Sequence, residues 1–308
     1  MANHQPIAAE PPIPEELWDL MARIGPRWGS DVGGNVRRMV EAYSEVLKAS
    51  PKDGVAVTRD VAYGPHPRQH FDVFQPEGTG PGPHPALLFV HGGAFVEGHR
   101  NRTDEIYSNV LYFFARRGVV GVNIGYRLAD DSSYPAASSD IASVVDWVRE
   151  NAAEWRIDAA RIYLMGHSAG GAHAASYAYD RRIHGDAGHG LAGLVIVSGR
   201  VRADNLPENP NARKVEAYYG TDPGRLDDCS PVSHVDADSP RTFIAFSEFE
   251  NPLIDVYCLE LAYRLAKARR KAPPVYFLKR HNHTSAIAHF NTSETALGEA
   301  ILEFIHGR

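Results

Sequence analysis

Six short apolar segments, separated by stretches with helical periodicity, constrain the fold of this chain more than any other feature. The apolar segments are 86–90, 119–124, 161–165, 191–197, 242–246 and 275–278. Continuous apolar runs of this length are typical of strands that are buried on both faces. Helices are expected between them, near 103–117, 135–154, 169–180, 255–270 and 292–306. This alternation predicts a mainly parallel sheet with helices on both faces, and ligands beyond the carboxyl ends of the strands.

The first part of the chain has a different pattern. Residues 1–14 are polar and rich in proline, so we expect a disordered arm there. Apolar residues repeat at helical spacing over 17–24 and 36–47, which predicts two amphipathic helices. Residues 55–58 and 70–74 alternate with a period of two, which predicts two antiparallel strands.

Composition excludes several classes of protein. Of the 308 residues, 44% are hydrophobic and 23% are charged, as in an ordinary globular protein. Two cysteines cannot form a disulfide scaffold, and no apolar run reaches the roughly 18 residues that cross a bilayer. The net charge is −6 without a basic tract, so we expect neither nucleic acid nor a membrane as a partner. Since no signal pattern is visible at the N-terminus, we expect a cytoplasmic protein.

A predicted nucleophile lies in the segment Gly166-His167-Ser168-Ala169-Gly170. This G-x-S-x-G pattern follows the strand at 161–165 and precedes a helix, which is the context that gives the pattern its meaning. Glycine is needed at the flanking positions because side chains there would collide with neighbouring elements. The turn lifts the Ser168 hydroxyl above the sheet, at the N-terminus of the next helix. We therefore interpret Ser168 as a nucleophile for acyl transfer.

A second turn, His91-Gly92-Gly93-Ala94-Phe95, ends the strand at 86–90. Acyl transfer develops negative charge on an oxygen, and each preorganised N–H group aimed at that oxygen contributes roughly 3–4 kcal/mol. We expect the donors to be the N–H groups of Gly93, Ala94 and Ala169, with Gly92 shaping the turn. Alone, the segment could be an ordinary Gly-Gly turn, but the serine turn downstream favours the oxyanion role.

These motifs resemble those of α/β-hydrolase-fold carboxylesterases of the hormone-sensitive-lipase and related esterase type. The matching segments are His91–Ala94, Tyr126–Ala129, Tyr134–Ala136 and Gly166–Gly170, with a late acid and histidine. The resemblance runs from about residue 55 to the C-terminus. Ala94 stands where many members have glycine, and Asp130-Asp131 stand where the family usually has Pro-Glu. Neither departure touches the chemistry directly.

The resemblance implies a fold and a division of the chain. The fold is an α/β hydrolase with a mostly parallel central sheet, helices on both faces and a small N-terminal helical cap. Residues 1–50 would then form the N-terminal arm and helical cap, and residues 51–308 the catalytic domain. The family's pattern also implies that Arg127 and Asp140 brace the oxyanion loop.

The rest of the predicted triad also comes from the resemblance, in which the order is nucleophile, acid, histidine. The implied histidine is His283, in the loop after the last strand, with His281 as the alternative. The implied acid is Glu250, the third residue after Ser247, where most relatives have aspartate. Asp255 is the alternative acid, although a carboxylate at the start of a helix has a sufficient structural explanation.

The expected function is hydrolysis of small, short-to-medium acyl esters by Ser168, with His283 as base and Glu250 stabilising the imidazolium. An arylformamidase or small amidase, a fold that binds a ligand without catalysis, and a metallohydrolase are alternatives. We expect no cofactor and no metal, although His281-x-His283 and His184-x-Asp186-x-x-His189 contain metal-ligand residue types. The expected partner is a small-molecule ester, and the sequence is compatible with a homodimer.

Overall fold

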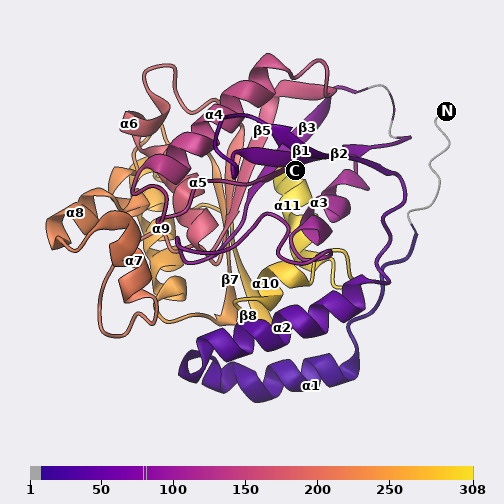
Figure 1. Cartoon of the computed structure of the whole chain (residues 1–308), viewed down its shortest axis with the longest axis horizontal. Coiled ribbons are helices and arrows are strands. Elements are labelled where there is room, and N and C mark those ends of the chain that lie inside the picture. Colours follow the sequence, from indigo (N-terminus) through magenta and orange to yellow (C-terminus); the bar gives the residue numbers. More distant parts are fainter. Residues whose placement is uncertain (1–7, 79, 81, 308) are drawn as a thin grey trace.

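A single sheet organises the computed structural model, which describes residues 8–78, 80 and 82–307 (Figure 1). Its strands are β1 (Val55–Ala62), β2 (His70–Pro76), β3 (His84–Val90), β4 (Val120–Ile124), β5 (Ile157–His167), β6 (Gly193–Val197), β7 (Thr242–Phe249) and β8 (Val275–Asn282). Their spatial order is β1-β2-β4-β3-β5-β6-β7-β8. The pairs β1–β2 and β2–β4 are antiparallel, and all pairs from β4 to β8 are parallel. The predicted parallel sheet with an antiparallel beginning is confirmed.

Helices cover both faces of this sheet, as the alternation predicted. They are α3 (Ser108–Ala115), α4 (Ala136–Glu150), α5 (Ala169–Tyr179), α6 (Arg181–His184), α7 (Ala212–Tyr219), α8 (Pro223–Asp228), α9 (Ile254–Arg269), α10 (Ser285–Ala288) and α11 (Ala296–His306). Helices α4, α5 and α9 share one apolar core with alternate residues of β3 such as Leu88. Helices α3 and α11 share the other core with the intervening residues such as Phe89. In the described part of the chain, no helix combines the length and apolar character that crossing a bilayer requires.

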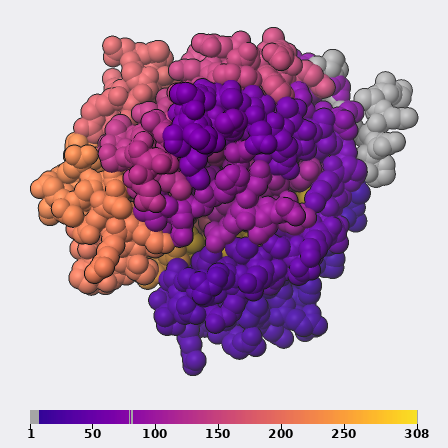
Figure 2. Space-filling model, in the orientation of Figure 1, coloured from indigo at the N-terminus to yellow at the C-terminus, as the bar shows by residue number. Residues whose placement is uncertain are grey.

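The N-terminal helices pack against the end of the sheet where β7 and β8 finish. They are α1 (Glu15–Ile24), the 3-10 segment η1 (Gly25–Ser30) and α2 (Val32–Leu47). Figure 1 shows α1 and α2 side by side below β7, β8 and α10, and Figure 2 shows them as an indigo lobe with a furrow along its border. Met21 and Tyr43 of this lobe are fully buried and belong to the same core as Phe89. We call residues 15–47 the cap.

The predicted disordered arm differs from what the structure describes. Residues 1–7 lie outside the described residues, but residues 8–14 pack against the body of the protein. The Arg116 guanidinium donates to the Ala8 carbonyl at 2.8 Å, the Ser293 N–H donates to the Pro11 carbonyl at 2.9 Å, and Ile13 is buried. Polar, proline-rich composition did not reveal these contacts because the partners lie far away in the sequence.

Candidate active site

Ser168 lies in a strained turn between β5 and α5. Its backbone has φ 56° and ψ −122°, a conformation that L-residues rarely adopt outside functional sites. A Cβ on Gly170 would lie 2.2 Å from the Val90 carbonyl oxygen, so only glycine fits at that position. The chain thus passes directly under the end of β3, and the Ser168 side chain stays partly exposed above the sheet.

The structure brings Ser168, His283 and Glu250 together in one hydrogen-bonded series. His283 Nδ1 lies 2.6 Å from Glu250 Oε2, and His283 Nε2 lies 3.0 Å from Ser168 Oγ. Because an ionised carboxylate only accepts, Nδ1 carries the ring proton and Nε2 accepts from the serine hydroxyl. The His283 and Glu250 side chains are 5% and 3% exposed, so the pair is shielded from water.

The second oxygen of the Glu250 carboxylate also has partners. Oε1 accepts from the Ser247 N–H at 2.8 Å and from the hydroxyl of Ser198, which directly follows β6. Ser198 is fully buried and has φ 49°, in the left-handed region. Sequence reasoning missed Ser198. The Ser-Gly pair directly after a buried strand was the available signal, because a carboxyl-terminal strand end faces the site in this type of sheet.

The alternative triad residues lie elsewhere. His281 Nδ1 lies 3.1 Å from Ser285 Oγ, and its ring packs edge-on against Trp18. Burial, followed by the neighbouring His289, holds the pKa of His281 well below its usual value. Asp255 lies in the first turn of α9. Both ring nitrogens of His283 already have partners, so the hydrogen-bonded series has no place for Asp255.

The predicted oxyanion turn lies against Ser168. The three residues Gly93, Ala94 and Phe95 have φ values of 151°, 48° and 73°. A Cβ on Gly93 would lie 1.7 Å from the Glu97 carbonyl oxygen, so this position excludes every other residue. Among the described residues, the N–H groups of Gly93 and Ala94 donate to no main-chain oxygen. Ala169 is the first residue of α5, where the N–H group has no partner inside the helix.

Side chains from several elements hold this turn. Tyr126 donates its hydroxyl to the His91 carbonyl at 2.6 Å, and the two rings stack with centroids 4.4 Å apart. Arg127 forms an ion pair with the buried Asp140 at 2.6 Å. Asp140 also accepts from Gln69 at 2.8 Å. This network ties the residue before β2, helix α4 and the segment after β4 together behind the oxyanion turn.

Two histidines on either side of Ser168 are neutral. The His167 Nε2–H donates to the His283 carbonyl at 3.0 Å, which links the serine turn to the histidine loop. Burial, followed by the nearby His283, holds the pKa of His167 well below its usual value. His173 packs edge-on against Phe95 and Tyr126, and burial lowers its pKa to about 3.

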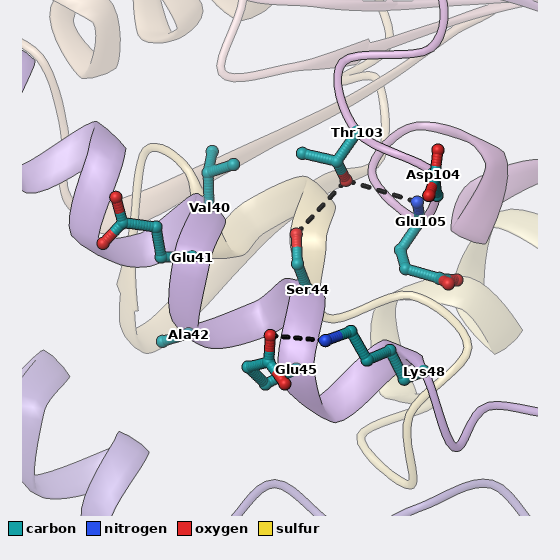
Figure 3. Close-up of a pocket in the computed structure, with 9 residues that line it drawn as sticks. All are labelled: Val40, Glu41, Ala42, Ser44, Glu45, Lys48, Thr103, Asp104 and Glu105. Carbon is teal, nitrogen blue, oxygen red and sulfur yellow. Dashed lines mark hydrogen bonds and ion pairs between the residues drawn. The ribbon is translucent and has the colours of Figure 1, made fainter.

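Other parts of the surface do not contribute to this constellation. Within the described residues, no group of three or more His, Cys, Asp or Glu side chains could hold a metal ion. A groove of about 510 Å³ lies between α2 and residues 103–105, with Val40, Glu41, Ser44, Lys48 and Thr103 among its lining residues (Figure 3). None of the predicted site residues lines it.

Comparisons with known proteins agree with this fold. Residues 71–190 match the BD-FAE family model. Versiconal hemiacetal acetate esterase of Dothistroma septosporum is 28% identical over 198 residues, which is 64% of this chain and 56% of that protein. Esterase LipC of Mycobacterium tuberculosis is 33% identical over 162 residues, covering 53% of this chain and 35% of that protein. The chain therefore spans about half or less of the length of these curated relatives.

Solved structures align with a larger share of the chain than the curated relatives do. A bacterial heroin esterase has a TM-score of 0.71 and 24% identity, covering 90% of this chain and 92% of that chain. Esterase LipW from Mycobacterium marinum has a TM-score of 0.68 and 21% identity, covering 94% and 91% of the two chains. At these identities the likeness shows the fold. The chain therefore has the α/β-hydrolase fold of these solved esterases, and part of its sequence is similar to that of the curated esterases.

Proposed function

We propose that this protein is a serine carboxylester hydrolase that acts on small, short-to-medium acyl esters through an acyl-enzyme intermediate. The observation that carries the proposal is the series from Ser168 Oγ through His283 to Glu250, at 3.0 and 2.6 Å. A serine hydroxyl is a weak nucleophile until a neighbouring base takes its proton, and His283 Nε2 is within hydrogen-bond distance.

In the first step, Ser168 Oγ attacks the ester carbonyl carbon while its proton passes to His283 Nε2. The resulting imidazolium is stabilised by the Glu250 carboxylate at Nδ1. The carbonyl oxygen becomes negative, and the N–H groups of Gly93, Ala94 and Ala169 are placed to donate to it. The backbone around these donors is held before substrate arrives, so little reorganisation is needed during the reaction.

In the following steps, His283 gives its proton to the leaving alkoxide, and the alcohol departs. Water then enters, His283 accepts a proton from it, and the hydroxide attacks the acyl carbon. Collapse of the second tetrahedral intermediate returns the proton to Ser168 and releases the acid. No step requires a cofactor.

A short acyl group fits the extent of the covering elements. Between β6 and β7 the chain forms only two short α-helices, α7 and α8, and one 3-10 turn in its described residues, which is too little for a large separate lid. We propose that residues 1–50 form the arm and cap over the site and that residues 51–308 form the catalytic domain. One relative carries the words acetate esterase in its name, which agrees with a short acyl group.

An organophosphonate and a series of esters test the proposal together. The wild-type protein should be labelled stoichiometrically at Ser168, and Ser168→Ala should not be labelled. Activity on p-nitrophenyl esters should be highest at short chains. Faster turnover of N-formyl aryl substrates would favour an arylformamidase, inhibition by a chelator alone would favour a metallohydrolase, and absence of labelling would contradict the serine mechanism.

We also propose that the chain forms a homodimer through α9 and the edge strand β8, in a cytoplasmic setting. Val256, Leu259 and Tyr263 repeat at helical spacing on α9 and are exposed, and Phe277 on β8 is 48% exposed. Both cysteines are unpaired and buried, which agrees with a reducing compartment. Light scattering should give twice the chain mass for the wild type and the monomer mass for Leu259→Glu. A monomeric wild type would contradict the dimer.

A further inference from the structure

The turn between β7 and α9 carries Glu250 and depends on contacts from outside for its shape. Residues 250–253 belong to neither the strand nor the helix. Leu253 has φ 71°, in the left-handed region, and the Ile254 N–H closes the turn on the Asn251 carbonyl at 3.1 Å. We call residues 250–253 the acid turn. A carboxylate on such a turn keeps its place only if the turn itself is held.

The cap contacts the acid turn directly. The indole Nε1–H of Trp28, in η1, donates to Asn251 Oδ1 at 2.7 Å, and both side chains are buried. Asn251 is the residue next to Glu250. Gly25 lies flat against Phe249, because a Cβ at Gly25 would be 2.3 Å from that ring. A hydrogen bond shielded from water holds its partners more firmly than an exposed one.

The backbone at Trp28 is held from within the cap. Asn35 Nδ2, on α2, donates to the Trp28 carbonyl at 3.2 Å. Asp31 caps α2 by accepting from the Gly34 N–H at 3.0 Å. The backbone that carries the indole is therefore tied to α2, and the indole links it to Asn251.

A second contact to the acid turn comes from the body of the protein. Arg200 Nη2 donates to the Pro252 carbonyl at 3.1 Å, and Arg200 Nη1 pairs with the buried Asp204 at 2.8 Å. The Arg200 N–H also donates to the Ser168 carbonyl at 3.1 Å. The acid turn is thus bonded both to Arg200 on the body and to Trp28 on the cap.

We propose that Trp28 is a positioning residue for Glu250. Through Asn251 it fixes the acid turn, so the cap takes part in aligning the acid and does not only enclose the substrate. Trp28 bonds to Asn251 and not to the reacting groups, and it acts through the turn. This inference rests on the proposed ester hydrolysis by Ser168, His283 and Glu250.

The test uses Trp28→Phe in the full chain, which keeps an aromatic ring and removes the N–H donor. We expect kcat on p-nitrophenyl acetate to fall about 10-fold while KM stays within about twofold, because a small displacement of a positioned group slows chemistry more than it weakens binding. Asn251→Ala removes the acceptor and should have the same effect. The double variant should lose no more than either single variant, as expected when both changes remove one interaction.

Ser44→Ala is the matched control. Ser44 joins the cap to the body through a hydrogen bond to Thr103 at 3.2 Å, away from the acid turn (Figure 3). Its kcat should equal that of the wild type. A second measurement is the downfield proton resonance of the His283 Nδ1–H, which should shift in Trp28→Phe and stay in place in Ser44→Ala.

Three results would overturn the inference. They are a Trp28→Phe variant with raised KM and normal kcat, an equal loss of kcat in Ser44→Ala, and fully additive losses in the double variant. If thermal melting shows that Trp28→Phe does not fold, Asn251→Ala alone decides between a lowered and an unchanged kcat. A wild-type protein that neither hydrolyses esters nor reacts with the phosphonate overturns the proposed function instead.

Discussion

The turn that carries Ser168 and the turn that carries Glu250 both join a strand to a helix, yet they are held in different ways. The serine turn depends on its own glycines, since a Cβ on Gly170 would lie 2.2 Å from a carbonyl oxygen of β3. The acid turn is held by side chains from two other segments: Trp28 in the cap, and Ser198 and Arg200 in the loop after β6. A requirement for glycine is visible in five consecutive residues, whereas a set of distant donors is not. Two neighbouring turns of one site can therefore differ in kind: residues within the turn fix the shape of one, and residues distant in the sequence fix the shape of the other.

The largest expected effect is at the locally determined turn. Ser168→Ala removes the nucleophile and should lower kcat by about 10⁵–10⁶-fold, as in other serine hydrolases. The fold should be retained, because alanine leaves the turn's glycines in place. Initial rates on p-nitrophenyl acetate, with a thermal melt of the same sample, check this. Retention of most of the activity would show that the serine turn is only structural.

The next effect addresses the acid turn. Glu250→Gln should lower kcat by about 10³–10⁴-fold, since the amide favours the wrong histidine tautomer. Glu250→Asp should recover part of the loss, limited by its shorter reach. Asp255→Asn is the control and should cost only about 0.5–1 kcal/mol of unfolding free energy, at the start of α9. Steady-state rates measure the change in kcat, and urea unfolding measures the change in stability. A large loss of kcat in Asp255→Asn with nearly normal kcat in Glu250→Gln would assign the acid to Asp255.

A third change tests whether the oxyanion turn, like the serine turn, requires glycine at a fixed position. Gly93→Ala should lower kcat by about 10²–10³-fold, because the added Cβ would meet the Glu97 carbonyl at 1.7 Å and displace the donors. Ala94→Gly keeps the N–H and suits φ 48°, so it should retain activity and stability. Rates on a short ester distinguish the two, and equal losses would mean that the donors lie elsewhere.

A smaller effect is expected at Ser198, which the sequence did not reveal. Ser198→Gly suits φ 49° better than serine does but removes the hydroxyl that donates to Glu250. We expect kcat to fall about 10-fold, since Ser247 still donates to the same oxygen and only the alignment of the carboxylate suffers. Unchanged kcat would show that the Ser247 bond alone is sufficient.

The smallest effect on activity is expected at His173, behind the serine turn. Burial lowers its pKa to about 3, from an ordinary value of 6.5, so the unfolded chain takes up a proton that the folded chain does not. Stability from this group is therefore complete above about pH 6.5 and is lost as the pH falls toward 3. His173→Phe should weaken the decline of unfolding free energy between pH 7 and pH 5, with kcat unchanged. Urea unfolding at several pH values measures this, and an identical slope in the two proteins would contradict it.

Much of the fold could be predicted from the sequence, and part of the site as well. Apolar runs such as 86–90 and 242–246 indicated buried parallel strands, and β3 and β7 contain them. The elbow around Ser168 was visible as a motif between a strand and a helix. The sequence identified the triad acid less firmly, because Glu250 was implied by a resemblance and Asp255 lies in the same strand-to-helix segment. The structure brings Glu250, and not Asp255, to His283.

The sequence by itself determined the features that depend on neighbouring residues: the strand and helix order, the cap helices, and the glycine-bearing turns at Gly93 and Gly170. These features repeat with a period or occupy consecutive positions, so they can be recognised within a short stretch of sequence. Only the tertiary structure decided which side chains hold the acid. Trp28 and Asn251 are 223 residues apart, and Ser198 and Glu250 are 52 apart. A hydrogen bond across such separations depends on how the sheet and the cap pack together, and no periodicity in the chain records it.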